Sequence, residues 1–462
     1  MKNIPVKVRE PLYKKGSRIE LTVSALDEDG YGIGAVETSQ VKVTGVLPGE
    51  KAVVRIEHVG RHSMTASSLK ILQPSRERCK SPCTCVKECE GCPLIEMKYE
   101  AQLLWKENIV TNHIKQHKSL ENTTILPVIP SPRKLEYRNS AKLVIGGKFA
   151  EPVIGIYRRE SHDIQDISNC PLHNPLINRI ISVVKKGIIK GKIPIYSPRS
   201  AQGLLRYLLI RVAEAENKAM VTIVTAKRSY NELHHLTTLI KKEIPEVTVI
   251  AQNVNSSSGN VILGSRNFFH TRQTSLQATV GGLRFLVSPH SFFQVNSGAA
   301  GLIYELVREY SSLTGKENVL DLYCGVGSIS IFLAASAKSI FGIESVEDAV
   351  EDARLNAKMN RAFNCEFEAG DVVDEMKNII AGGTGIDVTV LNPPRKGCEE
   401  RVLKQVASLD TPRIIYVSCS PWSLSRDLVI LDSLGYSCLK VQPVDMFPQT
   451  THIESVALLY RR

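Results

Sequence analysis

Cys419 and Glu454, both near the end of the chain, are the residues best suited to covalent chemistry. Cys419 follows an apolar run and precedes Ser420-Pro421, so its thiol is predicted at a strand end, held by a proline. That position suits an exposed thiolate nucleophile. Glu454 stands just before the last apolar run and is placed to remove a proton, with His452 as the competing base. The alternative interpretation of Cys419 is a buried structural thiol, since free cysteines are often buried.

A thiolate and a base of this kind predict a reaction on a pyrimidine ring. Carbon C5 of uracil is a poor nucleophile, but addition of a thiolate at C6 makes C5 enolate-like and able to attack a methylsulfonium group. A base must then remove the C5 proton so that the thiol can be eliminated. Cys419 is therefore the candidate nucleophile, and Glu454 is the candidate base.

A glycine-containing turn, DLYCGVG at residues 321–327, follows a predicted strand and precedes a predicted helix. Glycines there let the backbone turn tightly and approach a ligand that a Cβ atom would exclude. Glu344, after the next strand, is placed to accept hydrogen bonds from a ribose, and Asp371 follows the strand after that. The turn lacks the lysine of a phosphate-binding P-loop, which disfavours hydrolysis of a nucleoside triphosphate. The pattern predicts a site for a nucleoside cofactor.

Asn392-Pro393-Pro394-Arg395 follows a further buried run. Two prolines after a strand stiffen the loop and end the ladder of hydrogen bonds, and the asparagine can bind a planar base or the cofactor. The same tetrapeptide type occurs in enzymes that methylate exocyclic amines. Amine methylation therefore stays an alternative, and it predicts that Cys419→Ala retains activity.

Five cysteines crowd into the 14 residues from Cys79 to Cys92. The N-terminus has basic residues but no apolar core behind them, so no secretory signal is expected and a disulfide framework is disfavoured. Metal binding or catalysis is the better expectation. Four thiolates suit both a structural zinc site and an iron–sulfur cluster, so the residues alone leave these two open.

From about residue 286 onwards, predicted strands alternate with predicted helices. This alternation indicates βαβ units and a largely parallel sheet, in which reactive groups gather at the carboxyl ends of the strands. The motifs above stand at such ends. We therefore expect a Rossmann-like catalytic domain over residues 286–462.

The first part of the chain predicts two further domains. Short β-branched runs with glycine-rich turns at residues 17–73 predict a small OB-like β-barrel, a frequent platform for oligonucleotides, which we assign to residues 1–74. Residues 135–285 mix strands and helices, so we expect a central α+β domain over residues 75–285. The predicted fold class is multidomain α/β.

Composition and charge limit the possible partners. The chain has 462 residues, of which 43% are hydrophobic and 23% are charged, as in ordinary globular proteins. Residues 1–285 hold 42 Lys and Arg against 25 Asp and Glu, whereas residues 286–462 hold 16 against 22. This asymmetry fits an acidic catalytic unit joined to a basic portion that meets a polyanion, although lysines that keep the protein soluble are the alternative. We expect a cytoplasmic protein with no membrane segment.

Five motifs occur together in one known order: SFFQVN at residues 291–296, DLYCGVG at 321–327, NPPR at 392–395, VSCSP at 417–421 and THIES at 451–455. With them the chain resembles the RNA (uracil-5-)-methyltransferase family, in particular its bacterial 23S ribosomal RNA branch, and the N-terminal unit resembles the TRAM domain of that branch. The resemblance implies that Cys419 is the nucleophile, that Glu454 is the general base and that S-adenosylmethionine is the methyl donor. It implies a set of cofactor-site positions: Gln294, Tyr323, Ser328, Glu344, Asp371 and Asn392.

The chain departs from the family pattern at three places. The family often has Asp at the position of Asn392, Asn at the position of Ser328, and S-C-N-P where this chain has SCSP. None of these departures removes a group that the chemistry needs.

The resemblance also extends to the cysteines. Cys83, Cys89 and Cys92 have the spacing that this family uses for a 4Fe-4S cluster, and Cys170, with 77 residues between it and Cys92, fits the fourth ligand. The resemblance therefore favours iron–sulfur over zinc and leaves Cys79 and Cys85 as spare. It also favours ribosomal RNA, because transfer-RNA enzymes of bacteria usually lack both the barrel and the cysteine cluster, although some archaeal ones retain them.

A uridine inside a base stack cannot reach Cys419, so the substrate must be single-stranded or flipped out. Candidate RNA contacts are Tyr137-Arg138, Phe292, Phe293 and the basic stretch at residues 76–80, with core aromatics or solvated charges as the alternative. The resulting hypothesis is a monomeric enzyme that methylates C5 of a uridine in 23S ribosomal RNA. The same chemistry on transfer RNA, and a non-catalytic RNA-binding or assembly protein, are the rival functions.

Overall fold

The computed structural model describes residues 13–37, 39–60, 63–158, 161–257, 259, 261–383 and 385–462. Residues 1–12 of the predicted barrel domain lie outside this described part. The backbone divides into two compact units, residues 1–105 with 449–451, and residues 106–448 with 452–462. The three-domain division at residues 74 and 285 stays a prediction.

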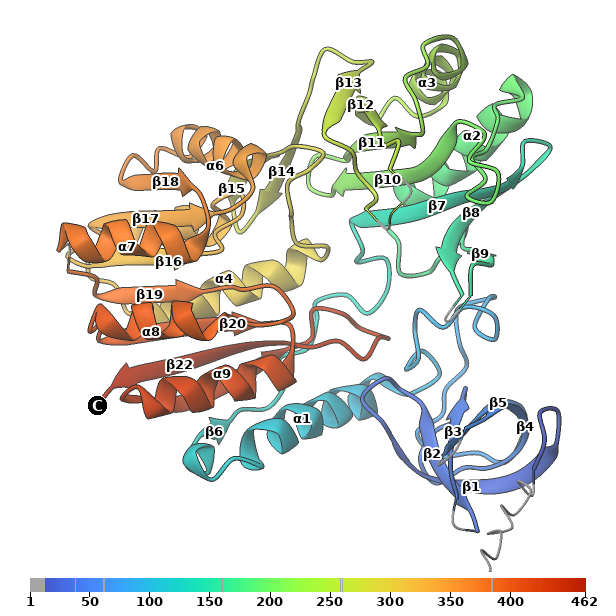
Figure 1. The fold of residues 1–462 in the computed structure, drawn as a ribbon, viewed down its shortest axis with the longest axis horizontal. Helices are drawn as coiled ribbons and strands as arrows, with labels where there is room; N and C mark the ends of the chain where they lie inside the picture. The colour runs from blue at the N-terminus through green and yellow to red at the C-terminus, as the bar shows by residue number, and fades with distance from the viewer. Residues whose placement is uncertain are drawn as a thin grey trace, which may run out of the picture. The chain divides into compact units, whose positions relative to one another are not determined.

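The first unit contains a closed barrel of five strands in the order β1-β2-β3-β5-β4 (Figure 1). Alternate side chains along these strands are buried in the barrel, including Val41, Val43, Val54 and Ile56. This alternation is the pattern expected of strands with one face in a core. The predicted small barrel is thus confirmed, with strands β1 (Arg18–Leu26), β2 (Gly32–Val36), β3 (Ser39–Thr44), β4 (Lys51–Val59) and β5 (Ser63–Gln73).

A long helix, α1 (Tyr99–Lys115), follows the cysteine-rich segment. It leads through the short helix η1 (Lys118–Leu120) to the two-residue strand β6 (Thr124–Ile125). Strand β6 pairs in parallel with β21 (Tyr436–Val444), at the edge of the C-terminal sheet.

The central α+β region is built on a seven-stranded sheet in the order β13-β12-β11-β10-β7-β8-β9. Its helix α2 buries one apolar stripe, with Ile177, Ile180, Ile181 and Val184 among its buried residues, as an amphipathic helix on a sheet does. A separate hairpin, β14–β15, leads to the C-terminal domain. The elements are β7 (Ser140–Lys148), β8 (Glu151–Tyr157), β9 (Ile164–Asp166), α2 (Pro175–Gly191), β10 (Leu205–Ala213), β11 (Lys218–Thr225), α3 (Asn231–Glu243), β12 (Val247–Val254), β13 (Arg266–Phe269), β14 (Leu276–Val280) and β15 (Leu283–Val287).

The C-terminal domain holds an eight-stranded sheet in the order β18-β17-β16-β19-β20-β22-β21-β6, with helices on both faces (Figure 1). Strands β18 to β20 in this order are parallel, whereas β22 is antiparallel to both of its neighbours. The predicted Rossmann-like domain is confirmed. Its other elements are α4 (Ser297–Ser311), β16 (Asn318–Leu322), α5 (Ser328–Leu333), η2 (Ala334–Ser336), β17 (Ser339–Glu344), α6 (Glu347–Met359), β18 (Cys365–Ala369), α7 (Val372–Gly382), β19 (Val388–Leu391), α8 (Glu400–Ser408), β20 (Arg413–Ser418), α9 (Pro421–Ser433) and β22 (Glu454–Arg461).

A buried ion pair anchors the segment that leads to the last strand. The Lys106 ammonium lies 2.6 Å from the Asp445 carboxylate and donates a second hydrogen bond, of 3.0 Å, to the carbonyl of Phe447. Both charged side chains are fully buried. Burial lowers the pKa of Lys106, and the Asp445 carboxylate opposes that shift.

Removing one partner of this pair should be strongly destabilising. Lys106→Ala leaves the Asp445 charge buried and unpaired, which costs about 3–5 kcal/mol. We expect a lower midpoint of urea unfolding for this variant and a partial recovery in the double variant Lys106→Met/Asp445→Leu. The exposed Lys118 provides the matched control, Lys118→Ala. Equal midpoints for Lys106→Ala and the parent would contradict the assigned role.

In the described part of the chain, no helix is both long and apolar enough to cross a membrane.

Candidate active site

Three of the predicted cofactor-site residues follow neighbouring parallel strands. Tyr323 follows β16, Glu344 ends β17 and Asn392 follows β19. The strand register pairs Leu322 with both Ile343 and Leu391, so the three strands end at the same level. Carboxyl ends of parallel strands meet at one edge of the sheet, which is where such sheets bind their ligands.

The next two strands bring Cys419 and Glu454 together. Strands β20 and β22 are antiparallel, and Ser418 pairs with Ser455. Cys419 directly follows β20 and Glu454 is the first residue of β22, so each is the chain neighbour of one member of this pair. The two side chains are close enough for the Glu454 carboxyl to influence the pKa of the Cys419 thiol.

Burial raises the pKa values of both Glu454 and Cys419. Glu454 is 5% exposed, and burial raises the pKa of its carboxyl to about 8. Cys419 is half-buried, and burial together with the nearby Glu454 raises the pKa of its thiol to about 11. Burial, with a smaller effect of Glu454, therefore favours the neutral thiol in the resting site, and the thiolate stays the predicted reacting form.

Arg395 is the cation that opposes both shifts. It lowers the pKa of the Cys419 thiol and of the Glu454 carboxyl. A guanidinium N–H also lies 2.9 Å from Nε2 of His452, whose ring makes an edge contact with Phe447. His452 is therefore engaged by Arg395, which favours Glu454 over His452 as the base. The NPPR motif alone does not predict this role of Arg395.

The glycine turn is strained where a ligand would be held. Tyr323 has a left-handed backbone with φ 64°, which non-glycine residues adopt only where the surrounding structure imposes it. At Gly327, with φ 76°, a Cβ atom would come within 2.8 Å of the Phe367 ring, so packing requires glycine there. A Cβ atom at Gly325 would meet nothing within 4 Å, and the Gly325 N–H donates a hydrogen bond of 3.1 Å to Glu344. The turn is thus open above Gly325 and linked to the acidic residue of the next strand.

Asp321, the first residue of the turn motif, was missed as a functional candidate. One of its carboxylate oxygens accepts a hydrogen bond of 2.6 Å from Ser330, while the buried Oδ1 has no partner in the structure. Burial raises the pKa of Asp321 to about 7, with Glu344 adding to the shift. An orphaned buried carboxylate oxygen at a ligand edge fits a donor on a bound cofactor.

The remaining predicted cofactor residues lie around this edge. Ser328 begins α5 and lies near the buried Tyr304, which was not among the predicted site residues. Asp371 is exposed and caps helix α7 by accepting a hydrogen bond of 2.9 Å from the N–H of Val373. Its negative charge also raises the pKa of Tyr323.

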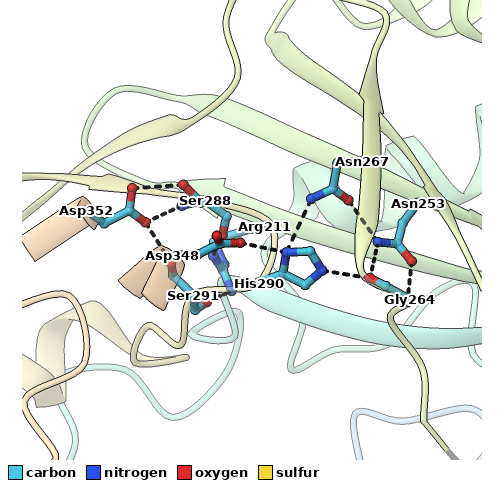
Figure 2. A network of polar contacts seen from close by, with 9 residues as sticks. All are labelled: Arg211, Asn253, Gly264, Asn267, Ser288, His290, Ser291, Asp348 and Asp352. Carbon is cyan, nitrogen blue, oxygen red and sulfur yellow. Dashed lines mark hydrogen bonds and ion pairs between the residues drawn. The ribbon is translucent and has the colours of Figure 1, made fainter. Parts of the chain in front are cut away.

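The loop before Gln294 is held by a buried polar network (Figure 2). The Arg211 guanidinium donates to the carbonyls of Ser288 and Ser291 at 3.1 and 2.8 Å. Asp352, on α6, accepts hydrogen bonds from the N–H and hydroxyl of Ser288 and from the hydroxyl of Ser291. Arg211 comes from the central sheet, so the network fixes the start of the SFFQVN segment between two layers of the second unit.

The end of the SFFQVN segment is fixed by two asparagines. Asn139 donates hydrogen bonds of 3.0 and 2.9 Å to the carbonyl of Gln294 and the hydroxyl of Ser297. Asn296 caps helix α4 and donates a hydrogen bond of 3.0 Å to the carbonyl of Met446. The half-buried Gln294 is thus positioned by backbone contacts on both sides.

Two of the four aromatic or basic RNA-contact candidates are core residues. Tyr137 is fully buried and its hydroxyl donates a hydrogen bond of 2.9 Å to the carbonyl of Pro448. Phe293 is buried in the core beside Phe285. Both therefore follow the core interpretation, whereas Phe292 is 63% exposed and stays a candidate RNA contact.

The cysteines predicted as metal ligands lie in two places. Cys83, Cys89 and Cys92 are half-buried in a loop of turns in the first unit, and Cys170 is half-buried before α2 in the second. Across the described ranges, no three or more His, Cys, Asp or Glu side chains are grouped so that they could hold a metal ion. The thiol of Cys79 lies 3.9 Å from the carbonyl oxygen of Ile95. The 4Fe-4S cluster therefore stays a prediction.

The raised pKa of Glu454 predicts a pH-dependent stability. Its folded-state pKa of about 8 lies above the ordinary 4.5, so folding favours the neutral carboxyl. Its contribution is complete below about pH 4.5 and is lost as the pH rises through about 8. Glu454→Gln, which cannot ionise, should melt like the parent near pH 4 and several degrees higher than the parent near pH 8.5. Glu351→Gln, an exposed change on α6, is the control and should show no such difference.

Comparisons with known proteins agree with this geometry. The family model described as tRNA (Uracil-5-)-methyltransferase matches residues 206–462, and the TRAM domain model matches residues 13–69. An uncharacterized RNA methyltransferase of Geobacter sulfurreducens is 53% identical over 98% of this chain and 92% of its own length. Another, of Caldanaerobacter subterraneus, is 35% identical over 97% of this chain and 99% of its own length.

A solved structure covers nearly the whole chain. The Pyrococcus abyssi tRNA (uracil-54, C5)-methyltransferase, in complex with S-adenosyl-L-homocysteine, has a TM-score of 0.77 and 27% identity. The match covers 96% of this chain and all of that one. The family and the TRAM domain predicted from the motifs are thereby confirmed. The chain belongs to the tRNA (uracil-5-)-methyltransferase family of RNA methyltransferases.

Proposed function

We propose that this protein transfers a methyl group from S-adenosylmethionine to C5 of a uridine in RNA through a covalent bond between Cys419 and C6 of the uracil. The observation that supports the proposal is the pairing of Ser418 with Ser455 at the ends of β20 and β22, next to Cys419 and Glu454, whose charges influence each other. A thiol and a proton-accepting carboxylate are the two groups that C5 chemistry requires.

The residues of the site divide the reaction into steps. Cys419 loses its proton to solvent, with Arg395 favouring the thiolate, and its sulfur bonds to C6 while the electron pair of the C5–C6 double bond becomes available at C5. The Glu454 carboxylate then accepts the C5 proton, the double bond re-forms, and the sulfur leaves C6. S-adenosylmethionine, when bound, supplies the methyl group that C5 takes between these steps.

The residues at the strand ends fit S-adenosylmethionine. The open backbone at Gly325 allows close approach of a ligand, and Glu344 is placed for the ribose hydroxyls. We also assign to the cofactor the unpartnered oxygen of Asp321 and the side chains of Tyr323, Ser328, Asp371, Asn392 and Gln294. Binding of S-adenosyl-L-homocysteine by the Pyrococcus abyssi enzyme supports this assignment.

For the RNA substrate we propose a uridine of 23S ribosomal RNA. The barrel and the cysteine-rich segment, which the resemblance associates with the ribosomal branch, support this choice. Transfer RNA is the second candidate, because the Pyrococcus abyssi enzyme that matches almost the whole chain acts on tRNA. Mass spectrometry of 23S RNA and of tRNA from cells with and without this protein decides between them. Loss of a 5-methyluridine from 23S fragments is expected, and a loss from tRNA alone would replace the first candidate by the second.

We further propose that Cys83, Cys89, Cys92 and Cys170 bind a 4Fe-4S cluster. Four thiolates form the donor set of such a cluster, which would staple the loop of turns around residues 83–92 to the segment before α2. Anaerobically purified protein should contain about four iron atoms per chain and absorb visible light. Cys170→Ser should lose this iron, whereas Cys438→Ser, in β21, should keep it. Colourless protein with stoichiometric zinc would contradict the proposal.

A further inference from the structure

Two exposed rings, Tyr230 and His234, and the half-buried ring of His270 form an aromatic cluster on the central region, far along the chain from the strand-end residues. Tyr230, just before α3, is 67% exposed. Its ring centroid lies 5.5 Å from that of His234 and 6.5 Å from that of His270, with an interplanar angle of 26° in both cases. His234 belongs to α3, and His270 follows β13. Rings from separate elements thus support one another in a stacked arrangement at the surface instead of packing in a core.

A cation stacked on a ring, Arg228 on Phe268, lies close in sequence to the residues of this cluster. The Arg228 guanidinium is 4.2 Å from the centroid of the Phe268 ring, on edge strand β13. Stacking on the ring orients the guanidinium and leaves its N–H donors for an anionic ligand. The Lys241 ammonium donates a hydrogen bond to the carbonyl of His270, which ties α3 to the end of β13. The turn after β11, helix α3 and strand β13 therefore converge, as their positions in Figure 1 also indicate.

The segments that carry these rings are strongly basic. Residues 227–242 and 266–272 contain six Lys or Arg residues and one acidic residue, Glu232, which accepts a hydrogen bond from Ser229. In the part of the chain that the structure describes, five of these cations are exposed and make no ion pair with a carboxylate. They are Lys227, Arg228, Lys242, Arg266 and Arg272.

We propose that these residues form a binding surface for a single-stranded segment of the substrate RNA. We call it the α3–β13 surface; it comprises residues 227–242 and 266–272. The cations would neutralise phosphates, and the aromatic cluster would stack on bases. This inference rests on RNA being the substrate, as in the proposed function, and adds where the RNA binds outside the strand-end site.

The combination of rings and cations favours a single strand over other polyanions. In a duplex the bases are stacked on one another, so their faces are unavailable to Tyr230. An acidic peptide would pair with the cations but would gain nothing from an aromatic stack. A strand that presents one uridine to Cys419 must itself be unpaired near that nucleotide, which provides a segment of the right kind.

Binding of a fluorescent oligouridine to the full-length protein tests the surface. Tyr230→Ala should raise the dissociation constant about tenfold, which is within the range expected for the loss of one stacking ring. Tyr230→Phe should restore the parental affinity. In Lys227→Ala/Arg228→Ala, the negative slope of log binding constant against log salt concentration should become shallower by about 1.4. Each phosphate contact that is lost removes about 0.7 from this slope for a single strand. Phe149, in the turn between β7 and β8, has a ring that is 43% exposed. Phe149→Ala is therefore the matched control and should bind the oligouridine as the parent does.

Parental affinity in both Tyr230→Ala and Lys227→Ala/Arg228→Ala would overturn the proposal. So would polyglutamate that competes equally well against the parent and Tyr230→Ala, because it would indicate a purely electrostatic site for acidic chains. If a variant fails to fold, ultraviolet cross-linking of the parent to the oligouridine replaces it: cross-links are expected within the α3–β13 surface, and cross-links only elsewhere contradict it. These measurements need no methyl transfer, so they are independent of whether the methylated atom is C5.

Discussion

Cys419→Ala should abolish methyl transfer while leaving the fold and RNA binding intact. Without the sulfur, C5 of the uracil is never activated, and we expect a loss of at least about 10⁴-fold in the rate of transfer of labelled methyl groups to RNA, the order of loss seen when other enzymes lose their nucleophile. The side chain is half-buried beside Glu454, and alanine removes only one heavy atom from this site. The thermal melting temperature should therefore change little.

Two other variants make this result specific. Cys419→Ser keeps the size and the hydrogen-bonding capacity but is a much weaker nucleophile, so it should be nearly as inactive as Cys419→Ala. Cys438→Ala changes a half-buried cysteine in β21, outside the strand-end site, and should retain parental activity. Substantial activity in Cys419→Ala would favour methylation of an exocyclic amine through the NPPR motif.

Glu454→Gln should stop the reaction at a later point and leave protein covalently bound to RNA. The amide has the shape of the carboxyl but cannot accept the C5 proton, so the sulfur cannot be eliminated from C6. Above about pH 8, where Glu454 is ionised, the change also removes a negative charge that adds to the effect of burial on the pKa of Cys419. We expect turnover to fall about 10²–10⁴-fold, the usual contribution of a general base.

Denaturing gel electrophoresis with labelled RNA distinguishes this outcome from simple inactivity. Glu454→Gln should give a slowly migrating protein–RNA band that survives denaturation, and the double variant Cys419→Ala/Glu454→Gln should give none. Turnover close to the parental rate in Glu454→Gln would assign the proton removal to another group, with His452 as the nearest candidate in the sequence.

Much of the architecture follows from local patterns in the sequence. The β-branched runs at residues 17–73 have the alternation of strands with one buried face, and they form the barrel. The alternation of strands and helices after residue 286 gives the parallel sheet. Because polar motifs stand at the ends of these strands, their convergence on one edge could also be predicted.

The electrostatics of the site could not be predicted in the same way. Ser418 and Ser455 pair across a gap of more than thirty residues, and this pairing brings Glu454 near Cys419, where burial and the carboxyl together raise the pKa of the thiol. Likewise, the contact of the Arg395 side chain with His452 depends on the direction of that side chain, which residue spacing does not predict. Tyr137-Arg138 was predicted as an RNA contact from its residue types, but tertiary packing buries the side chain of Tyr137 completely.

The central claim is that the sulfur of Cys419 bonds to the uracil ring whose C5 is methylated. Substrate RNA transcribed with 5-fluorouridine tests it directly, because Glu454 cannot remove fluorine as it removes a proton, and the adduct is therefore trapped. After incubation of the parent protein with this RNA and S-adenosylmethionine, nuclease and protease digestion and mass spectrometry should give the peptide that contains Cys419 carrying a methylated fluorouridine nucleotide. Recovery of that peptide unmodified, or of the nucleotide on a different residue, would contradict the account.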